Sequence, residues 1–134
     1  MTKHKVADLT GAVLDTAVMQ AFAKQHGLKI FVVERGHLIY SNESGDTQID
    51  PDVFKPSVNW WDAGPIIEHE RIDLRPMFEE GKFEDRWVAR LQPTVYDGHY
   101  RETTGWRHTA YGPTPLVTAM RAFVLSKLGD EVDL

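Results

Sequence analysis

Cysteine is absent from this sequence, and so are several other features that would identify a class of protein. Without cysteine the chain has no disulfide framework, no thiolate nucleophile and no thiolate-based zinc or iron–sulfur site. No apolar run approaches the roughly 18 to 20 residues that cross a bilayer. The basic start Met-Thr-Lys-His-Lys is not followed by the apolar segment of a secretory signal. We therefore expect no membrane partner and a cytoplasmic location.

Positive charge is also scarce. Its 15 basic residues are outnumbered by 20 acidic ones, the formal net charge is −5, and there is no Lys or Arg run. Because binding to a phosphate backbone needs an excess of positive charge, we expect no nucleic acid among the partners. The 134 residues, 42% of them hydrophobic, suffice for one domain with its own core. We predict a single domain over residues 1–134, with a flexible acidic tail at 130–134.

The signatures of common catalytic and cofactor sites are missing too. The sequence contains neither a Gly-x-Ser-x-Gly elbow nor a glycine-rich phosphate loop. Its six histidines are scattered, without the spacing of a metal site. The best acidic–imidazole cluster, Glu68-His69-Glu70, would point its consecutive side chains in different directions. We assign no catalytic, cofactor-binding or metal-binding residue and expect no cofactor.

The clearest element that is present is an amphipathic helix near the C-terminus. Thr114 can cap it, Pro115 suits its first position, and Gly129 follows its last apolar residue. Its core-facing residues span about 140° of a helical wheel. They are Leu116, Val117, Met120, Phe123, Val124 and Leu128, while Thr118, Arg121 and Ser126 fall outside. A stripe this wide predicts a helix packed on a sheet or on other helices.

The rest of the chain predicts a second long helix and several strands. The helix runs over residues 11–26 from the cap Thr10, with Leu14 on its apolar face and Asp15 pointing away. A short third helix would open at Pro65 with Gly64 as its cap. Segments of alternating or β-branched residues predict strands, and residues 41–53 and 94–105 have the composition of loops. The predicted strands lie at residues 29–34, 38–40, 72–75, 87–92 and 106–110.

These elements together predict an α+β fold. It is a two-layer sandwich of about five short antiparallel strands with two long amphipathic helices and a short third helix. The strands are antiparallel because short turns join them in sequence.

The aromatic residues indicate where a partner could bind. Trp60 and Trp61 are adjacent and cannot both bury in one core, so we predict that Trp60 is the core residue and Trp61 is exposed. Aromatic surfaces beside cationic donors suit a nucleotide base with its phosphate, or an aromatic-rich protein. The alternative is purely structural, with one tryptophan in the core and the other over an edge. The candidate binding surface consists of Trp61, Glu68, Trp106, Arg107, His108 and Tyr111.

Three segments share a pattern with a known family. They are Leu9-Thr10-Gly11 with Leu14-Asp15; Trp60 followed by Gly64-Pro65-Ile66-Ile67-Glu68; and Gly112-Pro113-Thr114-Pro115-Leu116 with Ala119-Met120-Arg121. In this order they resemble the NinX-like phage protein family, and the resemblance extends from Leu9 to about Val132. It implies a phage or prophage origin, an accessory role and the cytoplasm of a host bacterium. It brings no catalytic residue, cofactor or substrate.

The residues and the resemblance together predict a phage or prophage accessory protein that acts by binding rather than by catalysis. The partner is a protein or a small nucleotide-like ligand, and self-association into a homo-oligomer stays open. The alternative is a small enzyme acting on a nucleotide-type substrate, with Arg107, His108 and Glu68 at its site. Because Arg107 alternates with His108 along a predicted strand, their side chains would face opposite sides, which argues against the enzyme.

Overall fold

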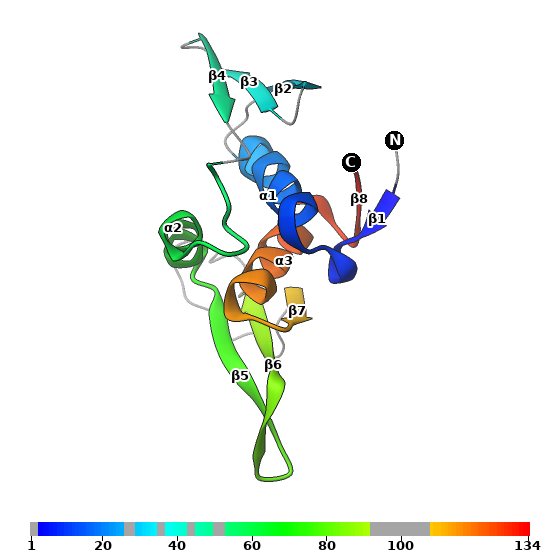
Figure 1. The fold of residues 1–134 in the computed structure, drawn as a ribbon, viewed down its shortest axis with the longest axis vertical. Helices are drawn as coiled ribbons and strands as arrows, with labels where there is room; N and C mark the ends of the chain where they lie inside the picture. Colours follow the sequence, from blue (N-terminus) through cyan, green and yellow to red (C-terminus); the bar gives the residue numbers. More distant parts are fainter. Residues whose placement is uncertain (1–2, 26–28, 35–36, 43–44, 50–52, 92–107) are drawn as a thin grey trace, which may run out of the picture.

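The computed structural model describes residues 3–25, 29–34, 37–42, 45–49, 53–91 and 108–134. Within these ranges α-helices combine with antiparallel sheets, so the predicted α+β class is confirmed (Figure 1). None of the helices in the described ranges is long and apolar enough to span a bilayer. The helices are the 3₁₀ helix η1 (Val6–Asp8), α1 (Gly11–Gln25), α2 (Trp60–Glu70) and α3 (Pro115–Leu128). The strands are β1 (Lys3–Lys5), β2 (Lys29–Glu34), β3 (His37–Asn42), β4 (Gly45–Ile49), β5 (Asp73–Glu79), β6 (Lys82–Leu91), β7 (His108–Gly112) and β8 (Glu131–Asp133).

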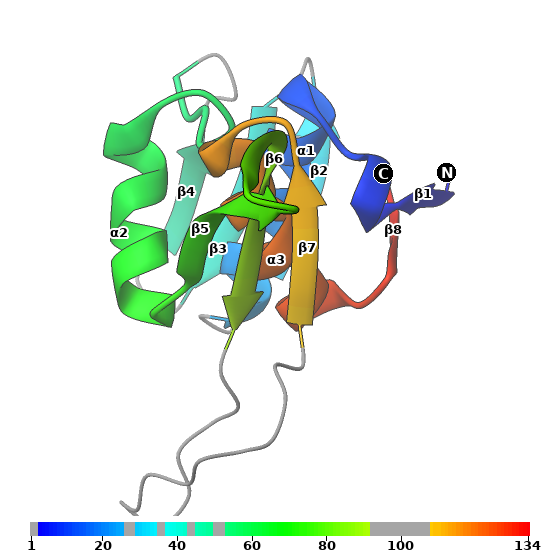
Figure 2. The same cartoon turned by 90° about the horizontal axis from the view of Figure 1, so that it is seen from below.

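Helix α3 is the central element of the fold. The Thr114 hydroxyl accepts a hydrogen bond from the backbone N–H of Val117 at 3.2 Å, and the helix ends at Gly129, where φ is 88°. On one side α3 packs on the sheet β5–β6–β7, and on the other on α1 (Figures 1 and 2). Because both sides are covered, Thr118 and Arg121 are buried, although the sequence predicted them outside the apolar sector.

The sheet that carries α3 has the order β5–β6–β7 and is antiparallel. Pro76 lies within β5, an edge strand of this sheet, next to a shift of register between Pro76 and Phe78, where a residue without an N–H is tolerated. Ala89 pairs with Ala110, and both are buried on the face toward α3. Tyr111, one residue further along β7, therefore belongs to the opposite face.

The other three-stranded sheet follows α1 and has the order β2–β3–β4. Pairing of Ile30 with Tyr40 confirms the predicted hairpin of β2 and β3. Residues 41–53 were predicted to be a loop, but part of them, Gly45–Ile49, forms β4 and pairs with β3. A polar segment can extend a sheet because the pairing uses backbone groups, and the side-chain pattern gave no sign of it.

Helix α2 begins five residues before the predicted position. Asn59 caps it by accepting the backbone N–H of Trp61 at 2.9 Å, and Pro65 lies inside the helix rather than at its start. Proline has no N–H to donate to the carbonyl four residues earlier, so α2 lacks one internal hydrogen bond there. The asparagine cap and the buried side chains of Ala63 and Ile66 hold the helix on both sides of this gap.

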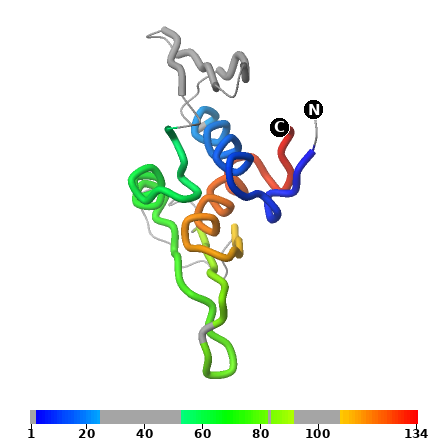
Figure 3. The backbone as a smooth tube through the Cα atoms, viewed as in Figure 1, coloured from blue at the N-terminus to red at the C-terminus, as the bar shows by residue number. Residues whose placement is uncertain are grey.

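The two ends of the chain meet in a short antiparallel ribbon of β1 and β8 (Figure 3). Lys3 pairs with Asp133, and the backbone N–H of Val6 donates to the carbonyl of Asp130 at 2.9 Å. The acidic tail was predicted to fray. In the structure residues Glu131–Asp133 of this tail form the paired strand β8, in which Val132 is buried between two exposed acids.

Asp15 is a further difference from the helical wheel. It was predicted to point away from the core, yet it is only 4% exposed. Its carboxylate oxygens accept the backbone N–H of Ser57 at 2.8 Å and the Ser57 hydroxyl at 3.0 Å. The segment before α2 therefore covers this side of α1.

Candidate functional site

The predicted binding residues that the structure describes lie on two different elements. Trp61 and Glu68 lie on α2, beside β5, whereas His108 and Tyr111 lie on β7 at the opposite edge of the sheet (Figures 1 and 2). His108 pairs with Leu91 and Tyr111 with Val88, so the two β7 side chains belong to opposite faces. The other two members of the predicted surface lie outside the described residues: Trp106 and Arg107.

Both tryptophans of the adjacent pair are exposed. Trp61 is 87% exposed, as predicted, but Trp60 is 57% exposed, so its assignment to the core is wrong. The core positions of α2 are taken by Ala63 and Ile66 instead. Since Val58 just before the helix is also 71% exposed, the start of α2 presents apolar surface to solvent.

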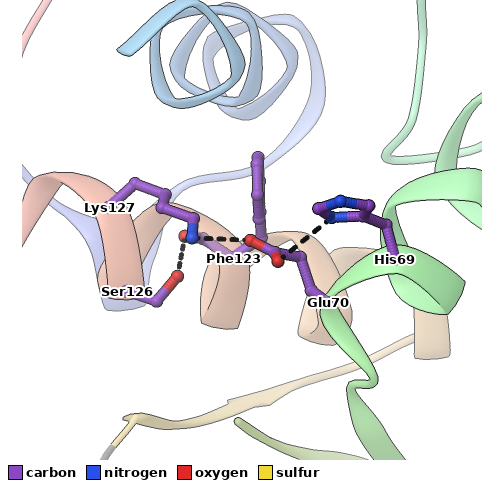
Figure 4. A network of polar contacts seen from close by, with 5 residues as sticks. All are labelled: His69, Glu70, Phe123, Ser126 and Lys127. Atoms are coloured by element: carbon purple, nitrogen blue, oxygen red, sulfur yellow. Dashed lines mark hydrogen bonds and ion pairs between the residues drawn. The ribbon is translucent and has the colours of Figure 1, made fainter. Parts of the chain in front are cut away.

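The acidic–imidazole cluster on α2 has a structural role. One carboxylate oxygen of Glu70 forms an ion pair with Lys127 Nζ of α3 at 2.7 Å, and His69 Nδ1 lies 3.4 Å from the other carboxylate oxygen (Figure 4). Lys127 also lies 5.9 Å from the ring centre of Phe123. The described residues contain no group of three side chains that could hold a metal ion. Glu70 thus joins α2 to α3.

A cavity of about 610 Å³ lies along β7, within the range typical of small-ligand pockets. We call it the β7 cavity. One side is β7 and the turn that follows it, the other is the chain-end ribbon with η1, and α3 and β6 supply further side chains. Its lining residues are Lys5, Val6, Ala7, Arg86, Thr109, Ala110, Tyr111, Gly112, Pro113, Arg121, Leu125, Asp130 and Glu131.

Gly112 sets the distance between β7 and α3. A Cβ atom at this position would lie 2.5 Å from Thr118 Oγ1 and 3.2 Å from the Thr118 backbone nitrogen. Thr118 cannot easily move, because its hydroxyl donates to the carbonyl of Thr114 at 2.6 Å. Strand β7, which forms one side of the cavity, can therefore approach α3 this closely only because residue 112 is glycine.

Arg121 connects the two sides of the cavity. Its Nε donates to the carbonyl of Leu9, which follows η1, and its Nη1 donates to the carbonyl of Tyr111 on β7, both at 2.8 Å. Arg121 is 8% exposed, and this burial lowers its pKa from the ordinary value, while the nearby charge of Asp8 acts in the opposite direction. The ion pairs found among the described residues do not include Arg121. A buried cation thus lines the cavity.

The rim of the cavity combines an aromatic ring with charges of both signs. The Arg86 guanidinium lies 5.8 Å from the ring centre of Tyr111, which is 47% exposed, and 3.2 Å from the carboxylate of Glu84. Lys5 and Glu131 face each other in the ribbon of β1 and β8. Such a rim can stack on the face of a flat ligand and attract a charged group at the edge of that ligand.

Sequence reasoning found one cavity residue, Tyr111, and missed the cations. Lys5 and Arg86 gave no sign, because they are single charges in short segments. Arg121 could have been noticed, because it is a charged residue in an apolar helix and belongs to a motif of the resembling family. A cation at such a position needs a buried partner or a ligand.

Comparison with known families gives one finding. The family model described as "Bacteriophage P22, NinX" matches residues 5–127, a range that includes most of the cavity lining. A search of curated proteins finds no match.

Proposed function

Because this chain belongs to the family of phage P22 NinX, we propose that it is a phage accessory protein that binds a small nucleotide-like ligand in the β7 cavity. In this proposal the ligand has a flat apolar body and an anionic group. Its role in the phage is to recognise that ligand rather than to transform it.

The observation that carries the proposal is the pairing of an apolar cavity with the Arg86–Tyr111 rim. Val6, Ala110 and Leu125 supply apolar lining, which favours the burial of a flat ring. Tyr111 and Arg86 offer an aromatic face and a guanidinium, both of which stack on nucleobases. Lining cations attract phosphate or carboxylate.

Calorimetric titration with a panel of nucleosides and nucleotides tests the proposal. We expect saturable binding to the wild-type protein and a loss of about tenfold or more in Tyr111→Ala, since one aromatic stack contributes about 1 to 3 kcal/mol. Trp61→Ala is the matched control, because it removes an exposed aromatic residue on α2 that does not line the cavity. Absence of binding across the panel, or equal losses in both variants, would contradict the proposal.

A second candidate function is the binding of a protein partner at the start of α2. The observation in its favour is the exposure of Trp60 and Trp61, since buried tryptophans are the commonest anchors of protein interfaces. Affinity capture from phage-infected cells tests it, with Trp61→Ala compared with Tyr111→Ala. A specific partner should be lost from the first variant and kept by the second.

The enzyme alternative has no comparable support. It requires Arg107, His108 and Glu68 at one site, but Glu68 lies on α2, which precedes the edge strand β5, whereas His108 lies on the other edge strand, β7. Arg107 lies outside the described residues. We therefore propose a binding function rather than the enzyme alternative.

A further inference from the structure

Arg121 presents the β7 cavity with a buried positive charge that the described residues leave without an ion pair. Its side chain is 8% exposed and donates to two neutral carbonyl oxygens, those of Leu9 and Tyr111. Carbonyl oxygens satisfy N–H groups but do not neutralise a cation, and the nearby charge of Asp8 acts on Arg121 without forming one of the ion pairs found among the described residues. A guanidinium has five N–H donors, so two bonds leave donors for a further acceptor. Burial of an unpaired charge is costly, and an anion in the cavity would offset that cost.

The orientation of the guanidinium is set before any ligand arrives. The two carbonyls belong to separate elements, the segment after η1 and strand β7, and they hold the Nε and Nη1 atoms in place. A planar group held in this way loses little freedom when it binds an oxyanion. Tyr111 contributes both to the position of Arg121 and to the aromatic rim, because its carbonyl holds Arg121 while its ring lies near Arg86.

The other charges limit how much negative charge the cavity can accept. The lining carries three cations, Lys5, Arg86 and Arg121, and two acids, Asp130 and Glu131, which leaves a formal balance of one positive charge. Arg86 is already paired with Glu84 at 3.2 Å. A chain of phosphates would bring several negative charges near Asp130 and Glu131, whereas a single anionic group can be matched by Arg121.

From these observations we infer that Arg121 is the anion-binding residue of the β7 cavity, and that the ligand carries one phosphate or carboxylate rather than a polyphosphate. This inference rests on the proposed function, because it concerns the same cavity and the same class of ligand. It adds which residue recognises the anion and how many anionic groups the ligand bears.

The first test compares a nucleoside with its 5′-monophosphate, its 5′-carboxylate and its 5′-triphosphate on the wild-type protein. We expect at least one of the two single-anion ligands to bind about tenfold or more tightly than the nucleoside, as one charge-assisted contact allows. We expect the triphosphate to bind no more tightly than the monophosphate. Equal affinity for the nucleoside and both single-anion ligands, or a clear preference for the triphosphate, would overturn the inference and leave the proposed function standing. If none of the four binds, the proposed function itself fails.

The second test asks whether Arg121 makes the contact. In Arg121→Gln the single-anion ligand and the nucleoside should bind with equal affinity, so that the preference for the anion disappears. Arg75→Gln is the matched control, because it removes a 57% exposed guanidinium that is paired with Asp73 outside the cavity, and the preference should be unchanged. A preference that survives in Arg121→Gln would overturn the assignment.

Arg121 also holds two carbonyls, so a measurement on the wild-type protein is needed beside the variant. The Nε–H group of Arg121 gives a nitrogen–proton NMR signal that Arg121→Lys identifies by its absence. We expect the nucleoside monophosphate to shift this signal, and potassium chloride at equal ionic strength to leave it in place. An unshifted signal with the monophosphate bound would overturn the inference, whether or not the glutamine variant folds.

Discussion

Both carboxylate oxygens of Asp15 hold Ser57, one through the backbone N–H at 2.8 Å and the other through the hydroxyl at 3.0 Å. Asp15 is 4% exposed and Ser57 is 3% exposed, so the contact lies in the interior. Burial raises the pKa of Asp15 above its ordinary value of 3.8, although the two hydrogen bonds from Ser57 act to lower it. The contact fastens the segment before α2 to α1 at the cost of a buried charge.

The raised pKa of Asp15 predicts a pH dependence of stability. A carboxyl group with a higher pKa in the folded protein than in the unfolded chain binds a proton more readily when folded. The contribution of Asp15 to stability should therefore fall as the pH rises from about 3.8 through the raised folded pKa, and then stay constant. Denaturant unfolding of wild type and Asp15→Asn at a series of pH values should show the asparagine variant gaining relative stability across this window. A constant difference between them would contradict the prediction.

Removal of the Asp15 carboxylate should destabilise the protein, because its hydrogen-bond partners lose their acceptor. In Asp15→Ala the backbone N–H and the hydroxyl of Ser57 stay buried without an acceptor, so we expect a loss of about 1 to 3 kcal/mol of unfolding free energy. Thr16→Ala on the same helix is the control, because the Thr16 hydroxyl donates to the carbonyl of Ala12 at an exposed position. That change should cost less than about 0.5 kcal/mol, and equal costs in a denaturant titration would refute this account.

Gly112→Ala should destabilise the protein by about 1 to 3 kcal/mol, as overpacking of a tight contact does. The added Cβ would meet Thr118 Oγ1 at 2.5 Å, and backbone atoms of Thr118 at 3.2 and 3.3 Å prevent an easy shift. Gly64→Ala makes the same chemical change where nothing lies within 4 Å, so it should be neutral or stabilising. Thermal unfolding measures both. The double variant Gly112→Ala/Thr118→Ala should recover part of the loss, since it removes the nearest atom.

The exposure of the tryptophan pair predicts small effects on stability. Trp60→Ala and Trp61→Ala should each cost less than about 1 kcal/mol, because neither side chain is in the core. Phe123→Ala removes a fully buried ring from α3 and should cost about 3 to 5 kcal/mol. Melting curves of the three variants decide the matter. A loss for Trp60→Ala as large as that for Phe123→Ala would mean that Trp60 is a core residue after all.

Local signals were read correctly from the sequence. Thr114 and Gly129 mark the ends of α3 because capping depends on a few neighbouring residues. Antiparallel pairing of the predicted strands at residues 72–75 and 87–92 is also found, in the longer hairpin of β5 and β6. The start of α2 was not, because the preference of proline for a first helical turn is statistical and the Asn59 cap took precedence.

What sequence reasoning missed depends on contacts between distant segments. The helical wheel assigns one core face to each helix, but α3 is covered on two sides and the segment with Ser57 covers α1. For that reason Asp15 and Arg121 were both predicted to face away from the core. The β7 cavity could not be predicted either, because its lining comes from β1, η1, β6, β7, α3 and β8. Tyr111 was found by its residue type alone.

The ribbon of β1 and β8 gives the β7 cavity one side that can open by itself. Its strands have three residues each, and a two-stranded ribbon of this size has little stability of its own. Local opening there leaves α3 packed between the sheet and α1, so it requires far less free energy than global unfolding. Backbone amides of residues 3–5 and 131–133 should thus exchange their hydrogens well before those of α3. When these two chain ends separate, the β7 cavity loses the side that Lys5 and Glu131 supply.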